Sequence, residues 1–346
     1  MTKKYMLSAM LLILLAALSA CSGNNEDSSG KPENKPKNEE TNVSEKGTTG
    51  TKVYVNNRDA GDVQVIDSDT NEVLDTIQVG EKPTYNEVGP NGDYVYVANS
   101  KTEDVSIINT SKNKVVKTIP VGKTPKGINF TPNGKWVFVI NEGEGTVTAI
   151  ETESMEKKAT IDVGKDPHNG VASPDNSTFY VTNTGSNSVS VIDVASKKVT
   201  NTIDGVEGAP HNLNITPDGN TLLVTLTTEG ELGIVDLNKD KMISTVTVGT
   251  GHHVVDVTAD GKYAYVANIG SDFVSVVDIA KQKEMKQINV GQGPHGVTVS
   301  KDGKNIYAAV TSKDQVAVID SEKNEVVKRI DVDSFPFFIS TLENRS

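Results

Sequence analysis

The sequence predicts an all-β protein in which seven four-stranded units form one closed ring. A related unit recurs at intervals of about 42 residues from residue 53 to the C-terminus. Within each unit apolar and polar residues alternate, as they do in half-buried strands. Asp-Gly or Asn-Gly pairs separate several of these strands and supply the positive φ angles of tight turns. The repeat indicates a single domain, although 346 residues alone would suggest about two.

The first twenty residues have the pattern of a secretory signal. Lys3 and Lys4 precede an apolar run from residue 6 to 18 that is short for a membrane span. Leu18-Ser19-Ala20-Cys21 resembles the lipobox of bacterial lipoproteins. The resemblance implies cleavage before Cys21 and acylation of its thiol. The alternatives are an ordinary signal peptide with a chance cysteine, or a retained membrane anchor.

Residues 21–50 are expected to form a lipidated, disordered tether. The segment after Cys21 contains one hydrophobic residue, Val43, and cannot bury enough apolar surface to offset the entropy of ordering. Its root-mean-square span is on the order of 30 Å. We therefore expect an extracytoplasmic protein that is lipid-anchored to the bacterial cell membrane.

Charge and cysteine content exclude several classes of partner and site. The formal net charge of −12 argues against nucleic-acid binding, which needs a basic face. An acidic body is also repelled by an anionic membrane, so the lipid anchor is the only membrane contact expected. A single Cys excludes a disulfide scaffold and multi-cysteine zinc or iron–sulfur sites. We expect a monomer.

Residues 51–346 are predicted to form the ring itself. In the sixth unit the strands are expected at 263–268, 273–279, 285–291 and 295–300. Four-stranded units of this period are typical of the blades of a β-propeller, which surround a central channel.

The two ends of the repeat region predict how the ring closes. The region starts on what is the second strand of a blade, at 53–55, and ends on a first strand, at 335–341. Pairing the C-terminal strand with the N-terminal blade would give seven complete blades and seal an exposed sheet edge. The alternative, an open solenoid, needs polar caps that the sequence lacks.

One tetrapeptide identifies the type of repeat. Tyr180-Val181-Thr182-Asn183 resembles the signature of YVTN-type β-propeller repeats, and close variants stand at 96–99 and 265–268. The fifth and seventh units depart from it, with Leu226 and Val310 in place of Asn. The resemblance implies the propeller fold. It leaves function open, because this architecture hosts binding proteins, lactonases, haem carriers and copper sites.

All histidines fall at one point of the repeat, just before the innermost strand: His168, His211, His252, His253 and His295. Four neighbouring blades would each place an imidazole beside the channel, where His168, His211, His253 and His295 could bind a transition metal or a haem iron. The preferred alternative is packing between blades. His211 and His295 share strand parity with apolar residues, and the clustering partly reflects descent of the repeat.

A second set of equivalent positions is polar and is expected to surround the channel below the histidines: Glu87, Asn129, Asn214, Asp256 and Thr298. Glu87 and Asp256 join the histidines as candidate ligand-binding residues. The alternative is a solvated channel wall. Two further sets are interpreted as architecture, namely the Asn after the second strand (Asn57, Asn99, Asn141, Asn183, Asn268) and the Asp after the third (Asp67, Asp193, Asp236, Asp278, Asp320).

Three functions remain open. The first is a surface lipoprotein that binds a ligand or a surface protein through loops at the histidine end, without catalysis. The second is a metal- or haem-binding propeller, similar to those of certain nitrite reductases and of nitrous-oxide reductase, although no covalent haem attachment motif is present. The third is a lactonase or other hydrolase using a channel-mouth histidine with Glu87 or Asp256. It ranks last because the basic residues of sugar lactonases have no counterpart.

Overall fold

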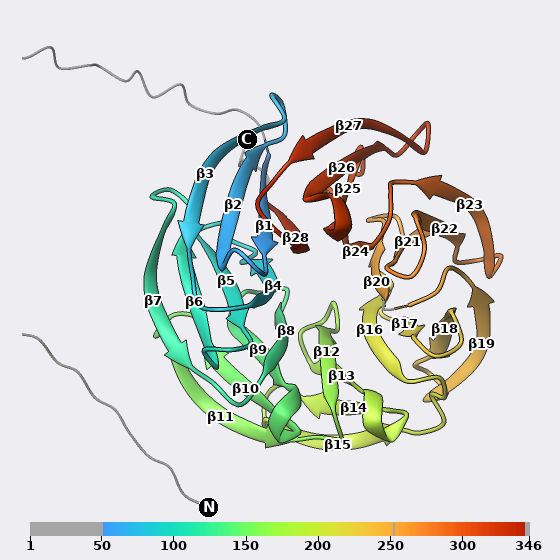
Figure 1. Ribbon diagram of the computed structural model, residues 1–346. Helices are drawn as coiled ribbons and strands as arrows, with labels where there is room; N and C mark the ends of the chain where they lie inside the picture. The colour runs from blue at the N-terminus through green and yellow to red at the C-terminus, as the bar shows by residue number, and fades with distance from the viewer. Residues whose placement is uncertain (1–50, 252, 343–346) are drawn as a thin grey trace, which may run out of the picture. The chain divides into compact units, whose positions relative to one another are not determined.

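The computed structural model of the chain describes residues 51–251 and 253–342, and it shows a ring of seven antiparallel sheets (Figure 1). Each sheet has four strands, which confirms the predicted all-β, seven-bladed β-propeller. In the described residues the remaining regular elements are three single 3-10 turns, η1 (Glu142–Glu144), η2 (Thr184–Ser186) and η3 (Thr311–Lys313). The expected signal segment, Cys21 with its predicted lipidation, the predicted tether and His252 lie outside the described residues.

Every blade runs outward from the channel in four strands. The innermost strands are β4 (Pro83–Val88), β8 (Pro125–Phe130), β12 (Pro167–Ala172), β16 (Pro210–Ile215), β20 (His253–Val257), β24 (Pro294–Val299) and β28 (Pro336–Leu342). The second strands are β1 (Lys52–Asn57), β5 (Tyr94–Asn99), β9 (Trp136–Asn141), β13 (Thr178–Asn183), β17 (Thr221–Leu226), β21 (Tyr263–Asn268) and β25 (Asn305–Val310). The third strands are β2 (Asp62–Asp67), β6 (Asp104–Asn109), β10 (Thr146–Glu151), β14 (Ser188–Asp193), β18 (Glu231–Asp236), β22 (Phe273–Asp278) and β26 (Gln315–Asp320). The outer strands are β3 (Glu72–Gln78), β7 (Lys114–Pro120), β11 (Glu156–Asp162), β15 (Lys198–Ile203), β19 (Lys241–Thr247), β23 (Lys283–Asn289) and β27 (Glu325–Asp331).

The hydrophobic core lies between neighbouring blades. Second and third strands are buried on both faces, since each sheet is covered by a blade on either side, as in the stacked rings of Phe138 and Phe179, whose centroids lie 4.4 Å apart. The outer strands are largely exposed and each buries one branched side chain: Ile77, Ile119, Ile161, Ile203, Val246, Ile288 and Ile330. Burying such a side chain contributes about 1.5–3 kcal/mol.

The ring closes through the C-terminal strand, as the ends of the repeat predict. β28 pairs with β1 in antiparallel register, with Ser340 opposite Tyr54, and so completes the first blade. The hydroxyl of Ser340 donates to Asn86 in the next blade. Every strand of the seven sheets lies within residues 52–342, so the propeller is complete without the first fifty residues and forms its own compact unit.

The Asn that ends the second strand joins neighbouring blades. Asn183 donates to the hydroxyls of Ser188 and Ser190 at 3.2 and 2.9 Å, and its oxygen accepts from the backbone N of Gly164 at 3.1 Å. Gly164 has to be glycine, because a Cβ there would lie 2.5 Å from Cγ of Asn183. These contacts give the signature Asn a role in holding the blades together.

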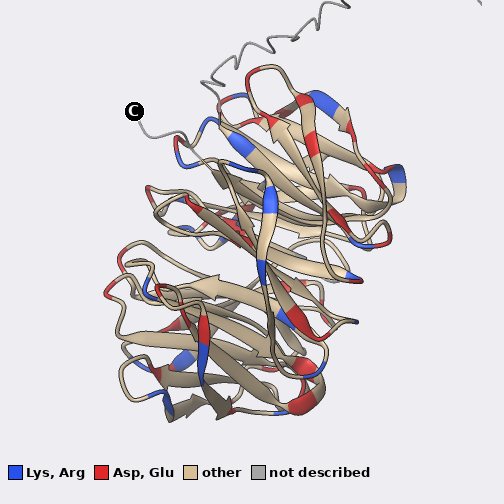
Figure 2. Ribbon diagram, turned by 90° about the vertical axis from the view of Figure 1, so that its left-hand side faces the viewer, with Lys and Arg blue, Asp and Glu red and all other residues tan. Residues whose placement is uncertain are grey.

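The Asp that ends the third strand caps the following turn. Asp67, for example, accepts from the backbone N of Asp69 at 2.8 Å and of Thr70 at 3.0 Å. On the side of the propeller seen in Figure 2, acidic and basic residues are interspersed over strands and loops. Within the described residues, no helix is long and apolar enough to cross a membrane.

Candidate functional site

A tyrosine crosses the central channel. The hydroxyl of Tyr85, on β4, accepts a hydrogen bond of 3.1 Å from the side chain of Asn212 on β16, three blades away. Its ring packs against Phe338 at a centroid distance of 4.3 Å and against His168 at 5.9 Å. Tyr85 is 1% exposed, and this burial raises the pKa of its hydroxyl. Tyr85, packed against Phe338 and His168, therefore separates the channel into two parts.

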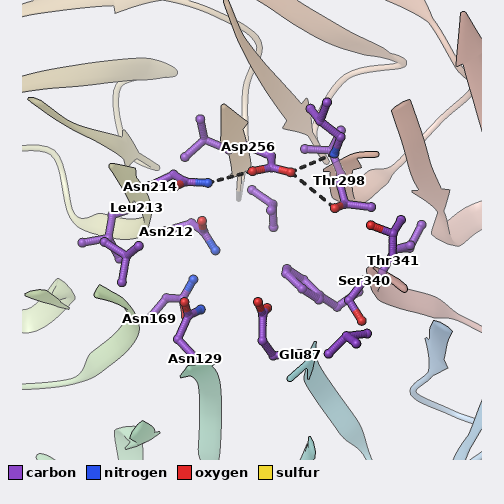
Figure 3. Close-up of a pocket in the computed structure, with 18 of the residues that line it drawn as sticks. Glu87, Asn129, Asn169, Asn212, Leu213, Asn214, Asp256, Thr298, Ser340 and Thr341 are labelled. Atoms are coloured by element: carbon purple, nitrogen blue, oxygen red, sulfur yellow. Dashed lines mark hydrogen bonds between the residues drawn. The ribbon is translucent and has the colours of Figure 1, made fainter. Parts of the chain in front are cut away.

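On one side of Tyr85 lies a cavity of about 270 Å³ (Figure 3). The five polar side chains that the repeat places at one position all line it: Glu87, Asn129, Asn214, Asp256 and Thr298. Asn169, Asn212, Lys301, Phe338 and Ser340 complete its polar and aromatic wall. The lining is thus rich in amide and carboxyl oxygens, with one lysine.

Asp256 is held by four donors. Its Oδ1 accepts hydrogen bonds from Nδ2 of Asn214 at 2.8 Å and from the backbone N of Val257 at 2.9 Å. Its Oδ2 accepts from Val299 N at 2.8 Å and Thr298 Oγ1 at 3.3 Å. Burial raises the pKa of Asp256 to about 6, and these hydrogen bonds hold it back from rising further. The carboxylate thereby links three consecutive blades.

Glu87 differs from Asp256 in its partners. Its carboxyl points into the cavity (Figure 3), and among the described residues it has no hydrogen bond and no ion pair. Burial, and then the charge of Asp256, raise the pKa of Glu87 to about 8, with Lys301 opposing the rise. Glu87 is therefore largely protonated at pH 7 in the free protein.

The described imidazoles, those of His168, His211 and His295, lie on the other side of the crossing tyrosine. Each belongs to the second residue of its innermost strand, three residues or roughly 10 Å from the carboxyl positions. His168 and His211 are 5–6% exposed and stack on each other with centroids 3.3 Å apart. His295 contacts the backbone O of Phe337 through Nδ1 at 2.9 Å and stacks on the ring of that residue. The side chain of His253 is outside the described part.

This placement bears on the two chemical alternatives. The described imidazoles stand roughly 10 Å along the strands from the positions of Glu87 and Asp256, a spacing that disfavours the histidine–carboxylate pair of the hydrolase hypothesis. In the described parts of the chain, no group of three or more His, Cys, Asp or Glu side chains is placed to hold a metal ion. Metal binding by all four histidines stays a prediction that depends on His253.

Several residues at the site could not be predicted from the sequence. Tyr85 and Asn212 are separated by 127 residues and meet only because the ring brings the second and fifth blades face to face. Lys301 lies in no repeated pattern that marks it, and Asn169 shares only the tripeptide Pro-His-Asn with the equivalent Asn212. The one available signal for Tyr85 is its size, since the equivalent positions include Gly127, Asn169 and Gly296.

Three family models match overlapping parts of the sequence. The model for the cytochrome D1 heme domain matches residues 216–337, that for the 7-bladed β-propeller lactonase matches 110–248, and that for the YNCE-like β-propeller matches 24–134. Each covers less than half of the chain, and the last two are models of β-propellers. Among curated proteins, no sequence matches significantly.

Solved structures with a similar fold include three whose sequences are less than 20% identical to this one. Hydrazine synthase of Kuenenia stuttgartiensis is 19% identical with a TM-score of 0.70, and the match covers 76% of this chain and 95% of that one. A functionally unknown protein from Desulfotomaculum acetoxidans is 15% identical, with a TM-score of 0.75 over 86% of this chain and 100% of that one. The dihydro-heme d1 dehydrogenase NirN, in complex with DHE, is 18% identical, with a TM-score of 0.63, and the match covers 82% of this chain and 64% of that one. The chain is a seven-bladed β-propeller repeat protein.

Proposed function

We propose that this protein is a YVTN-type lipoprotein of the bacterial cell surface whose propeller binds a small polar ligand in its central cavity, without catalysis. The observation that carries the proposal is the cavity of about 270 Å³ into which Glu87 points among amide side chains. Convergent polar groups in a preformed hollow are typical of small-molecule sites, which have volumes of roughly 300–1,000 Å³. A ligand of modest size fits this volume.

Ligand binding is tested with a protein of residues 51–346, which contain every strand of the propeller. A panel of small polar molecules is screened by thermal shift against the wild type and Asn129→Leu. Asn129 lines the cavity and its side chain bonds only to the backbone of its neighbour Ile128, so leucine fills space at little structural cost. A ligand that stabilises the wild type alone supports the proposal. Stabilisation of both proteins, or of neither by any compound, contradicts it.

The membrane anchor is tested separately. Mass spectrometry of the mature protein from the membrane fraction is expected to find acyl chains on Cys21 as the first residue. Cys21→Ser is expected to leave the chain unprocessed or to release it from the membrane. An unmodified Cys21 in the mature, membrane-bound protein would contradict the anchor.

The second candidate function is haem or metal binding, which the match of residues 216–337 to the cytochrome D1 heme domain favours. The central cavity does not fit a haem. It is small for a tetrapyrrole, its wall is polar, and the described imidazoles pack away from it. An absorption spectrum and elemental analysis of residues 51–346, purified without a His-tag, test this candidate. One equivalent of metal or haem, lost in His211→Ala with His253→Ala, would place it above small-ligand binding.

A further inference from the structure

The carboxyl group of Glu87 faces the cavity without an ion pair among the described residues. The titratable groups that line the cavity are Glu87, Asp256 and Lys301, and the lysine is exposed at its mouth. Lys301 acts on Glu87 only through space, because none of the ion pairs among the described residues involves either of them. A carboxylate removed from water is costly unless a cation or several donors face it. Glu87 is the group whose missing partner a ligand can supply.

Asp256 does not compete for that role. Each of its two oxygens already accepts two hydrogen bonds, so its lone pairs are occupied. Its charge still acts across the cavity, since it raises the pKa of Glu87. A cationic ligand is therefore attracted by the negative charge of Asp256, but its hydrogen bonds go to Glu87.

The remaining polar wall offers amide oxygens as acceptors beside amide N–H donors. The amide N of Asn129 donates to the backbone O of Ile128 at 3.0 Å, which leaves its oxygen for a ligand. The amide N of Asn212 is used by the crossing tyrosine, and the hydroxyl hydrogen of Ser340 is directed to the next blade. The oxygen of Asn169 packs against Gly127, and its nitrogen remains as a donor. The amide oxygens that stay open add acceptors beside Glu87 for a ligand that is rich in donors.

We propose, building on the function above, that the central cavity binds a small primary alkylammonium ion with Glu87 as its counter-ion. The ammonium group has three N–H donors and no acceptor, which matches a carboxylate together with the amide oxygens of Asn129 and Asn212. The aliphatic part lies along Val254 and Phe338, which also line the cavity.

Binding is coupled to release of one proton. The amine arrives as its ammonium form, the carboxyl of Glu87 gives its proton to solvent, and the ion pair forms without any change in covalent bonds. Since the pKa of Glu87 in the free protein is about 8, the apparent affinity falls about tenfold for each pH unit below 8. This dependence distinguishes an ionic partner from a merely structural residue.

The probe is n-butylamine, with 1-butanol as its neutral analogue, titrated into residues 51–346 and followed by NMR shifts of the side-chain amides of Asn129 and Asn212. Butylamine is expected to bind at pH 8, to bind about a hundredfold more weakly at pH 6, and to show no binding to Glu87→Gln. Lys301→Gln is the matched charge variant, and it is expected to move the pH dependence of binding to higher pH, because Lys301 lowers the pKa of Glu87.

Three results would overturn the proposal. Equal binding of butylamine to the wild type and Glu87→Gln removes Glu87 as counter-ion. Equal binding of butanol and butylamine shows that the cavity takes neutral molecules, which refutes the ligand class but keeps the small-ligand function. Failure of butylamine and of every compound in the polar panel refutes both the ligand class and the function.

Discussion

Two carboxyl groups at equivalent repeat positions, Glu87 and Asp256, show how partners decide the state of an acid. Both face the same cavity, and burial raises the pKa of both. Asp256 receives two backbone N–H donors and two side-chain donors, which stabilise its charge, whereas Glu87 receives none among the described residues. The repeat places the acids together, but the donors come from three blades and become visible only in the folded ring.

The raised pKa values predict a stability that falls with pH. A carboxyl whose pKa is higher in the folded than in the unfolded state favours folding below the unfolded pKa, and this contribution is lost as the pH rises through the folded value. For Glu87 the loss runs from about pH 4.5 to about 8, and for Asp256 from about 3.8 to about 6. Glu87→Gln should therefore be more stable than the wild type at pH 8–9, by on the order of 1 kcal/mol after allowance for solvent screening.

Urea unfolding of residues 51–346 at a series of pH values measures this effect. The wild-type curve should decline between pH 5 and 8, while that of Glu87→Gln stays flatter. Parallel curves for the two proteins would mean that folding does not raise the pKa of Glu87.

Tyr96 illustrates a local defect that one substitution should repair. Its hydroxyl is buried and has no hydrogen-bond partner among the described residues, whereas the equivalent Tyr265 donates to Asn324 at 3.1 Å. Met155 occupies the position of Asn324 in the neighbouring blade, at the same left-handed φ of about 51°. Met155→Asn should stabilise the protein by about 1 kcal/mol, because it supplies the acceptor and suits this backbone conformation.

A double-mutant cycle with Tyr96→Phe separates the hydrogen bond from the backbone effect. The gain in thermal unfolding temperature from Met155→Asn should shrink when residue 96 lacks its hydroxyl. An equal gain in both backgrounds would assign the effect to the turn alone.

At the scale of the element, the repeat explains nearly every strand. Period-two alternation and Asp-Gly turns locate the second and third strands, although the structure buries these strands on both faces, whereas the alternation predicts burial on one. The four strands of the sixth unit are found at 263–268, 273–278, 283–289 and 294–299, within two residues of the expected positions. The crossing contact of Tyr85 and Asn212 could not be predicted, since it depends on the diameter of the ring and not on any local pattern.

The signature Asn should be worth more than a single hydrogen bond. Asn183→Leu removes the partner of Gly164 N and of two buried serine hydroxyls, in a chain that already tolerates leucine at the equivalent position 226. The expected loss is about 2 kcal/mol or more, measured from the urea midpoint. Leu226→Ala serves as the comparison, because it loses packing and no hydrogen bond. A neutral Asn183→Leu would show that the Asn is a relic of the repeat and not a brace between blades.

At the scale of the whole molecule, one blade differs from the other six in how it is assembled. Six blades are continuous in the chain, whereas the first is held together by pairing of β28 with β1. Opening this pairing, the seam of the ring, exposes two strand edges and dissolves the cavity wall, to which β28 contributes Phe338 and Ser340. The ends of the repeat predict this closure because a ring with unpaired edges would leave two rows of backbone groups without partners.

A disulfide across the seam should lock the ring. Lys52 and Leu342 are opposite each other in the β1–β28 ladder, where paired Cα atoms lie about 4.5–5.5 Å apart, within the range that a disulfide spans. In residues 51–346, Lys52→Cys with Leu342→Cys has no competing thiol, because Cys21 is absent. Cross-linking nearly the whole chain should stabilise the oxidised protein by about 3–5 kcal/mol relative to its reduced form. The reduced form is the matched control, since it carries the same two substitutions. If oxidation raises the unfolding temperature and slows unfolding, the seam is where unfolding begins. If the oxidised protein forms the bond but unfolds as fast as the reduced one, unfolding starts within a blade and the C-terminal strand is not the weak point.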